Sequence, residues 1–565
     1  MTSLRFVVPV LLASLVGCSS SSDETPTAPT APPVDAAIPE EVIPKAVFGA
    51  CPKSYSDACA QIDVPLDHQN PTGETIKLHI ARKSAKTQPA KRQLWLLSGG
   101  PWQGGDSWFG VPDYLAPSLP DTDIFVVDHR GTGYSHRLTC SKQDLDEADG
   151  GYTLSPIFVK DCLKELRENG DYDRLKFFTT RNAAADVIRA IKATRTDEKV
   201  FLWGASYGTH WAHRILQLAP TLTSGIVFDG FVAPNRMSFV FDVDKSVDEA
   251  GKLFAAACTA NESCRGRLGG DALGKLNEVL ADLDKKPCID KKGPWRGAIS
   301  SMVDRWNTRA LIFPLVHRLE RCSADDQVAI RTMIKSLNAG AGGTALGTPS
   351  VTDAFRASGI LQYNIIYSDL WNVSGRPDPT RAQIVAAAEQ QTFLYGNDAN
   401  ESLAAMLWDV RQSWPLPPTD GAELPVPVKD TTTKLLWLAG EMDPRTPLGQ
   451  AKRVAEIYDP ASLVILPGAT HTPVFGAPLA KDASKFCGVE ILRRFVGEDV
   501  LDASCPKDVL PVVLEAPTAE FARSHWGTDD DWGDGKPKPA AKPGSRDLPL
   551  IVNGPSQRWF RPRSL

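Results

Sequence analysis

The sequence predicts an α/β fold: a mainly parallel sheet with a long helical segment inserted between its strands. From about Gln61, short apolar runs alternate with longer amphipathic stretches, which is the pattern of strands separated by helices. Several runs are continuously apolar and end in Gly, Asp or Ser, as in strands that helices cover on both faces. After Asn235 the strand pattern stops, and it resumes only at Lys434. The predicted strands are 76–81, 93–97, 124–127, 200–203, 225–228, 434–438 and 463–466.

The composition narrows the class of protein. Of 565 residues, 42% are hydrophobic and 23% are charged, which is ordinary for a globular chain and allows more than one domain-sized unit. The net charge of −6, from 62 basic and 68 acidic side chains, gives no electrostatic footprint for nucleic acid. We therefore expect no nucleic-acid partner, and the sequence carries no signal for an oligomeric state.

The N-terminus has the features of an export signal. Arg5 precedes the apolar run 6–13, which is too short to span a bilayer but suits a signal-peptide core. The run leads to Leu15-Val16-Gly17-Cys18, which resembles the lipobox of bacterial lipoproteins, where cleavage before the cysteine is followed by acylation of its thiol. We expect residues 1–17 to be a signal peptide and the protein to be lipid-anchored through Cys18 to a bacterial membrane, in the periplasm or at the cell surface. The alternative is an ordinary signal peptide cut nearby, and a secreted protein.

The cysteine count fits the same compartment. Removing Cys18 from the eleven cysteines leaves ten, an even number, which favours disulfides in an oxidising space. The sequence does not fix their connectivity. Pairing neighbours in order would join Cys51 to Cys59, Cys140 to Cys162, Cys258 to Cys264, Cys288 to Cys322, and Cys487 to Cys505. No spacing reads as a zinc site, and no metal or organic cofactor is implied.

The predicted organisation has six parts. Residues 18–45, rich in Ser, Thr, Pro and Ala, form a disordered tether behind the signal peptide. Residues 46–234 and 431–505 form the two parts of the α/β core, and the helical patterns in residues 235–430 form a lid between them. Residues 506–565 are predicted to be a mostly disordered tail, because 527–546 pass through three consecutive aspartates and then Lys-Pro pairs.

The first motif that carries chemistry is Gly204-Ala205-Ser206-Tyr207-Gly208. It lies directly between the predicted strand 200–203 and a helical pattern over 209–218. Glycines on both sides of a serine allow a strand to turn sharply into a helix, which raises the serine hydroxyl above the sheet. Ser206 is therefore the candidate nucleophile. The alternative is a glycine-rich turn in which the serine is incidental.

The second motif is the glycine-rich loop 98–105, which follows the predicted strand 93–97. An acyl-transfer enzyme places N–H donors where the tetrahedral oxygen becomes negative, and each donor lowers the barrier by roughly 3 kcal/mol. The backbone of Tyr207 is one candidate donor. The second is expected from Gly100 or Trp102, since Pro101 has no N–H. A turn without function is the alternative for this loop.

A serine nucleophile also needs a base and an acid that orients the base. On such sheets both follow the serine in the sequence, the acid first and the histidine after it. His471 lies in a loop just past the predicted strand 463–466, where a base is expected. The acid is expected after the preceding strand, 434–438. Asp443 is the first choice there and Glu441 the second.

Five sequence blocks, in the order in which they occur along the chain, resemble motifs of the tripeptidyl aminopeptidase and prolyl iminopeptidase family of α/β-hydrolases. The resemblance covers roughly residues 50 to 505 and includes a C-terminal segment similar to that of the tripeptidyl aminopeptidases. Each block matches a family motif: an oxyanion loop, a turn after a strand, the serine elbow, a block after the next strand, and the acid loop. In this chain they are 99–101, 128–135, 204–208, 229–234 and 440–447.

Two positions depart from the family pattern: Trp102 replaces a common Gly, and His129 replaces a common Gln. The resemblance implies a serine hydrolase that releases short peptides or amino acids from the N-terminus of oligopeptides through an acyl-enzyme, with lid carboxylates holding the substrate amine. Two alternatives remain: an esterase or other small-acyl hydrolase with the same triad, and a catalytically silent binding protein on this scaffold.

Overall fold

The computed structural model describes most of the chain from residue 43 to residue 539. The predicted signal peptide, Cys18 and residues 540–565 lie outside the described residues. Among those described, no helix has the length and apolar character needed to cross a bilayer. The described ranges are 43–52, 57–144, 154–233, 238–289, 295–342, 356–373, 376–396, 398–415, 428, 431–458 and 462–539.

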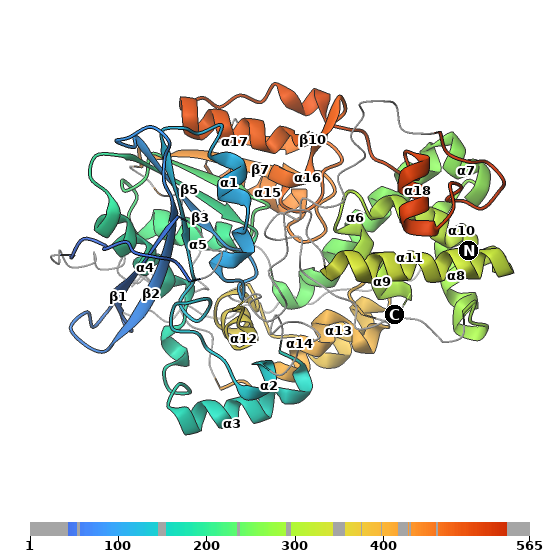
Figure 1. Ribbon diagram of the computed structural model, residues 1–565. Helices are drawn as coiled ribbons and strands as arrows, with labels where there is room; N and C mark the ends of the chain where they lie inside the picture. Colours follow the sequence, from blue (N-terminus) through green and yellow to red (C-terminus); the bar gives the residue numbers. More distant parts are fainter. Residues whose placement is uncertain are drawn as a thin grey trace, which may run out of the picture. The chain divides into compact units, whose positions relative to one another are not determined.

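The centre of the fold is an eight-stranded sheet with the order β1-β2-β4-β3-β5-β6-β7-β8 (Figure 1). The pairs from β4 through β3, β5, β6 and β7 to β8 are parallel, whereas β1 and β2 join the edge in antiparallel fashion. The predicted mainly parallel sheet is therefore confirmed, and each of the seven predicted runs lies within a strand. The strands are β1 (Ala58–Pro65), β2 (Thr75–Lys83), β3 (Arg92–Leu97), β4 (Thr122–Val127), β5 (Lys199–Ala205), β6 (Gly225–Asp229), β7 (Lys434–Gly440) and β8 (Leu463–Leu466).

Helices cover both faces of the sheet, which explains why its strands are continuously apolar. Side chains alternate between the faces, so Trp95 and Leu97 of β3 pack with helices α4 and α5, while Leu94 and Leu96 pack with α1 and α17. The helices of the α/β core are α1 (Val111–Leu115), α2 (Ser141–Asp144), α3 (Val159–Asn169), α4 (Thr180–Thr194), α5 (Tyr207–Leu218), α15 (Leu448–Ala455), α16 (Pro473–Gly476) and α17 (Cys487–Glu498).

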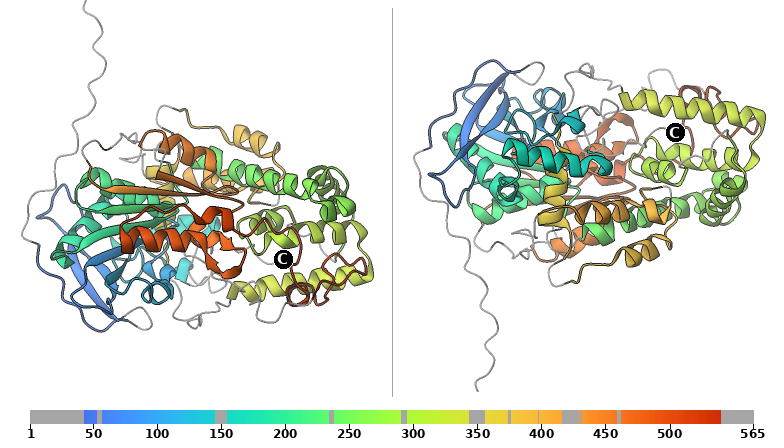
Figure 2. Two further views of the ribbon diagram at one scale, coloured as in Figure 1. Left: turned by 90° about the horizontal axis from the view of Figure 1, so that it is seen from above. Right: turned by 90° about the horizontal axis from the view of Figure 1, so that it is seen from below.

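Between β6 and β7 the described chain forms helices without strands, and we call this segment, 238–415, the insertion. Most of its helices lie beyond the strands, on the side away from β1 and β2 (Figures 1 and 2). The insertion contacts loops at the carboxyl ends of the strands: the Ser358 N–H donates to the Trp102 carbonyl at 3.0 Å, and the Arg356 carbonyl accepts from the Gly133 N–H at 2.7 Å. Its helices are α6 (Phe239–Ala260), α7 (Glu262–Leu268), α8 (Ala272–Lys285), α9 (Trp295–Val303), α10 (Ile312–Arg321), α11 (Ala324–Gly342), α12 (Gly359–Ile365), α13 (Arg381–Ala388) and α14 (Leu403–Arg411).

The prediction of a mostly disordered tail is wrong for residues 506–539. This part folds onto the insertion through helix α18 (Ala519–Trp526), which packs against α11. Trp526 and Trp532 are buried, and the Arg318 guanidinium donates through Nε to the Asp531 carbonyl at 2.7 Å. Local composition alone predicts disorder here, because the segment is mostly polar. Two buried indoles and hydrogen bonds from arginines distant in sequence stabilise its folded form. We call residues 515–538 the C-terminal strap.

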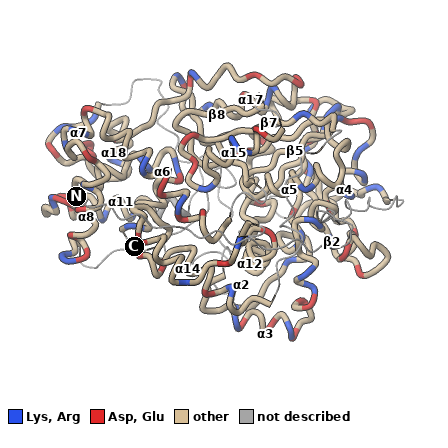
Figure 3. Tube along the Cα trace, turned by 180° about the vertical axis from the view of Figure 1, so that it is seen from behind, with Lys and Arg blue, Asp and Glu red and all other residues tan. Residues whose placement is uncertain are grey.

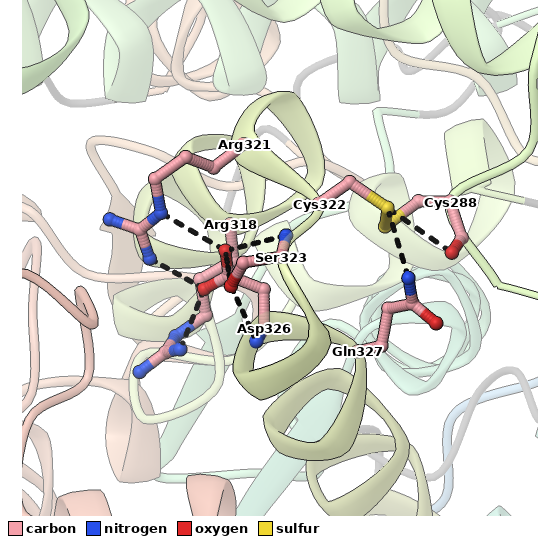
Figure 4. Close-up of a disulfide and its surroundings, with 7 residues drawn as sticks. All are labelled: Cys288, Arg318, Arg321, Cys322, Ser323, Asp326 and Gln327. Carbon is pink, nitrogen blue, oxygen red and sulfur yellow. Dashed lines mark hydrogen bonds and ion pairs between the residues drawn. A yellow bond between two sulfur atoms is a disulfide. The ribbon is translucent and has the colours of Figure 1, made fainter.

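The five disulfides obtained by pairing neighbouring cysteines in order are all present in the structure. One of them, Cys288–Cys322, lies at the end of α10 beside a buried ion-pair cluster (Figure 4). In that cluster Asp326 accepts from the guanidinium groups of both Arg318 and Arg321. The disulfide thus links the chain that follows α8 to the end of α10, and the ion pairs link α10 to α11, at the place where the C-terminal strap docks.

Charged side chains of both signs are interspersed along the elements of the fold (Figure 3). Helix α17 gives an example, since its Arg493 Nη1 lies 2.8 Å from Glu498 Oε1. Exposed pairs of this kind contribute about 1 kcal/mol or less each. The fold therefore depends on its apolar core and on the buried pairs.

Candidate active site

The three residues predicted to carry the chemistry all lie at one edge of the sheet. Ser206 follows β5, Asp443 follows β7 and His471 follows β8. These strands are parallel, so their carboxyl ends meet at the same edge, and only β6 separates β5 from β7. Each of the three side chains belongs to a residue that is only 2% exposed.

Ser206 occupies the sharp turn between β5 and α5. Its backbone has φ 55° and ψ −122°, a conformation that side-chain-bearing residues rarely adopt. The flanking glycines are required by close approach: a Cβ on Gly204 would lie 2.3 Å from the Gly208 carbonyl oxygen, and one on Gly208 would lie 2.1 Å from the Leu97 carbonyl oxygen. The sequence thus permits a tight strand–turn–helix that holds Ser206 in a strained, defined position.

Asp443 and His471 are in direct contact. Nδ1 of His471 lies 2.9 Å from both carboxylate oxygens of Asp443. The carboxylate also accepts from the backbone N–H of Arg445 at 2.8 Å, and from the backbone N–H and hydroxyl of Thr446 at 2.9 and 2.7 Å. Because Nδ1 donates to Asp443, the basic lone pair of the imidazole is on Nε2.

Glu441, the second choice for the acid, is placed elsewhere. Its carboxylate accepts from the Gly468 N–H at 2.8 Å, and its side chain is exposed. Its role is therefore to tie the loop after β7 to the loop after β8.

The end of β6 connects Ser206 to the histidine loop. The Ser206 N–H donates to the Asp229 carbonyl at 2.8 Å, while the Asp229 side chain accepts from the Val474 N–H at 3.0 Å, three residues after His471. A Cβ on the next residue, Gly230, would lie 3.2 Å from Nδ1 and Cε1 of His471. The imidazole thus packs against the end of the strand that lies next to the one carrying Ser206.

The glycine-rich loop after β3 lies against the serine. A Cβ on Gly99 would be 3.2 Å from the Ser206 Cβ, and Gly100 has φ 111°, a left-handed conformation that favours glycine. Tyr207 is the first residue of α5, so its N–H has no acceptor within the helix. The loop that contains Gly100 and Trp102 therefore lies beside Ser206, and the assignment of the Tyr207, Gly100 and Trp102 N–H groups as oxyanion donors stays a prediction. Trp102 itself is 1% exposed.

A chain of polar side chains lies beneath the elbow and reaches the insertion. The Tyr207 hydroxyl lies 3.1 Å from His129 Nε2 and 2.8 Å from Thr180 Oγ1, and Thr180 donates to the Asp369 carboxylate. His129 Nδ1 donates to the Arg130 carbonyl at 2.6 Å, and burial lowers the pKa of His129 to about 4. His129 is therefore a neutral acceptor for Tyr207, a role that the glutamine common in the family could also fill through its amide oxygen.

Two residues near the site had no assigned role in the sequence analysis. Burial, together with the nearby Asp443 carboxylate, raises the pKa of Asp229 to about 8. Thr446 donates to the acid with both its N–H and its hydroxyl. Both lie inside motif blocks identified from the sequence, so the motifs could have singled them out as residues near the site. Their hydrogen bonds could not be predicted in this way, because they depend on how the loops fold.

Comparison with protein families agrees with this geometry. Residues 94–478 match the family described as "alpha/beta hydrolase fold". The match covers more than half of the chain, so the chain belongs to the α/β-hydrolase family.

The individual proteins that match this chain have low sequence identity to it. The chain is 27% identical over 255 residues to the serine protease Hip1 of Mycobacterium tuberculosis, covering 42% of this chain and 47% of that protein. It is 26% identical over 212 residues to a tripeptidyl aminopeptidase of Streptomyces lividans, covering 34% of this chain and 38% of that protein. It is also 26% identical over 317 residues to carboxylesterase B of Mycobacterium tuberculosis, covering 51% of this chain and 56% of that protein. The chain thus spans about half the length of the curated relatives it matches, and the predicted resemblance to tripeptidyl aminopeptidases is confirmed at low identity.

Proposed function

We propose that this chain is a serine hydrolase that releases short peptides or amino acids from the N-terminus of oligopeptides. The observation that carries the proposal is the direct contact between His471 and Asp443, at the same sheet edge as Ser206 in its strained turn. Two relatives named as a serine protease and a tripeptidyl aminopeptidase support a peptide substrate.

The reaction would proceed in two acyl-transfer steps. Ser206 Oγ attacks the peptide carbonyl carbon, and Nε2 of His471 takes the hydroxyl proton. The backbone N–H groups near Tyr207 and Gly100 stabilise the negative oxygen. The C–N bond then breaks as His471 returns the proton to the leaving amine, and a water molecule, activated in the same way, releases the acyl group from Ser206.

The insertion supports a preference for short substrates. It contacts loops after β3 and β4 and the loop carrying Asp443, so it lies over the strand ends that hold the proposed site. We expect short peptides to be cleaved well and casein-sized chains to be cleaved poorly at internal sites. Efficient internal cleavage of casein would contradict this part of the proposal.

The nucleophile is tested by labelling with a fluorophosphonate. The wild type is expected to be labelled, and Ser206→Ala is expected to lose both labelling and hydrolysis. Ser118→Ala is a suitable control, because Ser118 is exposed and its hydroxyl only donates to the Leu115 carbonyl, at 2.9 Å. A folded wild-type protein that is not labelled would instead favour a binding protein without catalysis.

An esterase is the second candidate, because carboxylesterase B is among the relatives. Kinetics on tripeptidyl and aminoacyl amides, compared with short-chain esters, separate the two. Turnover of the amides that disappears in Ser206→Ala is expected for the peptidase. Activity on esters alone would assign the site to the second candidate.

We propose further that Cys18 carries a lipid anchor on an exported chain. The ten cysteines paired in five disulfides are compatible with export. Expression with a labelled fatty acid in a bacterial host is expected to label the wild type and to place it in the membrane fraction. Cys18→Ser is expected to lose both, whereas label that stays in this variant would contradict the anchor.

A further inference from the structure

A small recess lies behind the histidine loop, between the α/β core, the insertion and the chain that follows α17. The loop after β8 contributes Pro467 and Gly468, the insertion contributes Trp306 and Arg309, and the C-terminal chain contributes Val509 and Pro511 among other residues. Its walls are mostly apolar, with one guanidinium among them.

Arg309 is buried without a counter-charge. It is 4% exposed, and within the described chain its guanidinium forms no ion pair with a carboxylate. Nη1 lies 3.7 Å from the sulfur of Met442, the guanidinium carbon lies 5.7 Å from the centre of the Phe254 ring, and Nε is buried with no hydrogen-bond acceptor. Nη2 faces Gly468 at the recess, since a Cβ on that glycine would lie 3.9 Å from it.

Other deeply buried arginines of this fold are paired. Arg130 Nη2 lies 2.6 Å from Asp186, Arg318 Nη1 lies 2.9 Å from Asp326, and Arg445 Nη2 lies 2.5 Å from Asp304. Arg309 differs from these three because the groups around it are a thioether and an aromatic ring, which compensate a buried charge only weakly.

An uncompensated guanidinium is energetically unfavourable in such a place. Arginine stays protonated in proteins, so it cannot escape the desolvation penalty by losing its proton at neutral pH. Burial alone lowers the pKa of Arg309 to about 10, with no acidic neighbour to oppose the change. A bound anion in the adjoining recess would supply the missing negative charge.

We propose that the recess is an anion-binding site, in which Arg309 holds a small monovalent anion: a halide ion or the carboxylate of a small organic acid. One guanidinium balances one negative charge, and the limited volume and apolar walls disfavour large or multiply charged ligands.

The bound anion would join three parts of the molecule. Trp306 and Arg309 belong to the insertion, Met442 directly precedes Asp443, and Gly468 begins the turn that leads to His471. Binding there stabilises the folded chain by mass action, whatever reaction the site carries out.

The first test is thermal unfolding in sodium bromide and in sodium formate, with sodium gluconate replacing them at constant ionic strength. The wild type is expected to show a saturable rise in Tm with bromide or formate, and Arg309→Met is expected to lose that rise. In gluconate alone, Arg309→Met is expected to unfold at a temperature equal to or above that of the wild type, because the substitution removes an unpaired charge.

The matched control is Arg318→Met, which removes a buried arginine that has an aspartate partner (Figure 4). It is expected to be less stable than the wild type but to keep the saturable anion response. An equal anion response in the wild type and in Arg309→Met would overturn the proposal.

A second measurement does not require a folded variant. Anomalous diffraction from wild-type crystals grown in bromide is expected to show a peak within hydrogen-bonding distance of the Arg309 guanidinium. Soaking in excess formate is expected to remove that peak by competition. A recess without bromide at a saturating concentration would contradict the proposal.

Discussion

Asp229 is a carboxyl group whose burial favours its neutral form. It is 1% exposed, and its side chain joins Val474 of the histidine loop to Trp203 of β5 through N–H donors at 3.0 and 3.3 Å. Burial and the Asp443 carboxylate raise its pKa to about 8, from a usual value of 3.8. The folded protein therefore keeps a proton on Asp229 over a pH range in which the unfolded chain has lost it.

The sign of the resulting pH dependence follows from proton binding. Between about pH 4 and pH 8 the folded state binds more protons at this position than the unfolded state, so its contribution to stability decreases as the pH rises. Asp229→Asn keeps the shape and the acceptor oxygen but cannot ionise. We expect the Tm of the variant, relative to that of the wild type, to rise between about pH 4 and pH 8. Parallel Tm curves from pH 5 to pH 8 would show that Asp229 does not titrate in this range.

Arg445 connects the acid loop to the insertion. Its backbone N–H donates to Asp443, and its guanidinium pairs with Asp304, which also accepts from the Tyr395 hydroxyl at 2.7 Å. The Arg445 guanidinium lies 4.0 Å from the centre of the Tyr395 ring. The position of the proposed acid thus depends on a charge contributed by the insertion.

Asp304→Ala removes the carboxylate that pairs with this buried guanidinium. We expect the free energy of unfolding to fall by about 3–5 kcal/mol, and Asp304→Asn to lose less because it still accepts from Tyr395. Urea unfolding measures both. Asp409→Ala is the control: its ion pair with Arg381 is exposed, and its loss is expected to change stability by about 1 kcal/mol or less. Equal losses in Asp304→Ala and the control would show that the buried pair does not hold the loop.

At the scale of elements, the elbow requires β3, β5 and α5 to approach closely. A Cβ on Gly208 would lie 2.1 Å from the Leu97 carbonyl oxygen, a distance that only a shift of the backbone can relieve. The first turn of α5, with the Tyr207 N–H, would move away from β3 and from the glycine-rich loop that follows it.

We therefore expect Gly208→Ala to lower stability by about 3 kcal/mol or more and to abolish hydrolysis. Gly266→Ala is the matched change in helix α7, where an added Cβ meets nothing within 4 Å. It is expected to raise stability by about 0.5–1 kcal/mol, because alanine is the better helix former. Chemical denaturation of both variants checks this, and an active, stable Gly208→Ala protein would contradict the geometry of the elbow.

At the scale of the whole molecule, the C-terminal strap completes the insertion. Trp532 is 1% exposed, its ring receives the Arg267 guanidinium at 4.8 Å, and Lys538 pairs with Glu515 at 2.8 Å. Asp531 accepts from the Ala516 N–H at 2.6 Å, so the strap folds back on itself while it covers the helices.

Trp532→Ala is expected to cost about 3–5 kcal/mol, the usual range for removing a buried indole. Ending the chain at residue 513 is expected to be more severe and to expose the surface that α18 covers on α11. Ending it at residue 539 keeps every contact described here and serves as the control. Calorimetry of the three proteins makes the comparison, and unchanged unfolding of Trp532→Ala would show that the strap does not stabilise the insertion.

The sequence predicts well those features of this molecule that depend on local patterns. All seven buried strands, the order of the motif blocks and the five disulfides follow from local patterns, since continuous apolar runs and glycine-flanked turns leave a mark within a few residues. The edge strand β1 was not predicted, and the order in residues 506–539 was predicted wrongly. The folded tail depends on partners distant in sequence, Arg318 and Arg321. Strand β1 pairs with the next strand, β2, but mixes exposed and buried positions instead of forming a continuous apolar run.

The candidate site shows the same limit. Ser206, Asp443 and His471 were identifiable because each follows a strand in the expected order. The raised pKa of Asp229 and the unpaired charge of Arg309 were not identifiable, because each depends on which side chains surround the residue in the folded chain. Motifs indicate the reacting groups, whereas their electrostatic surroundings come from packing.

The position of the strap in the gene has a consequence for biosynthesis. Nε of Arg318 donates to the Asp531 carbonyl, which is translated 213 residues later, and Nη2 of the same side chain donates to the Asp530 carbonyl. At about 5–20 residues per second, a ribosome needs roughly 10–40 s to cover that interval. During this time a nascent chain exposes the docking surface of the strap, so the middle of the protein matures only after its end has been synthesised. Truncated translation products would therefore be good substrates for chaperones and proteases.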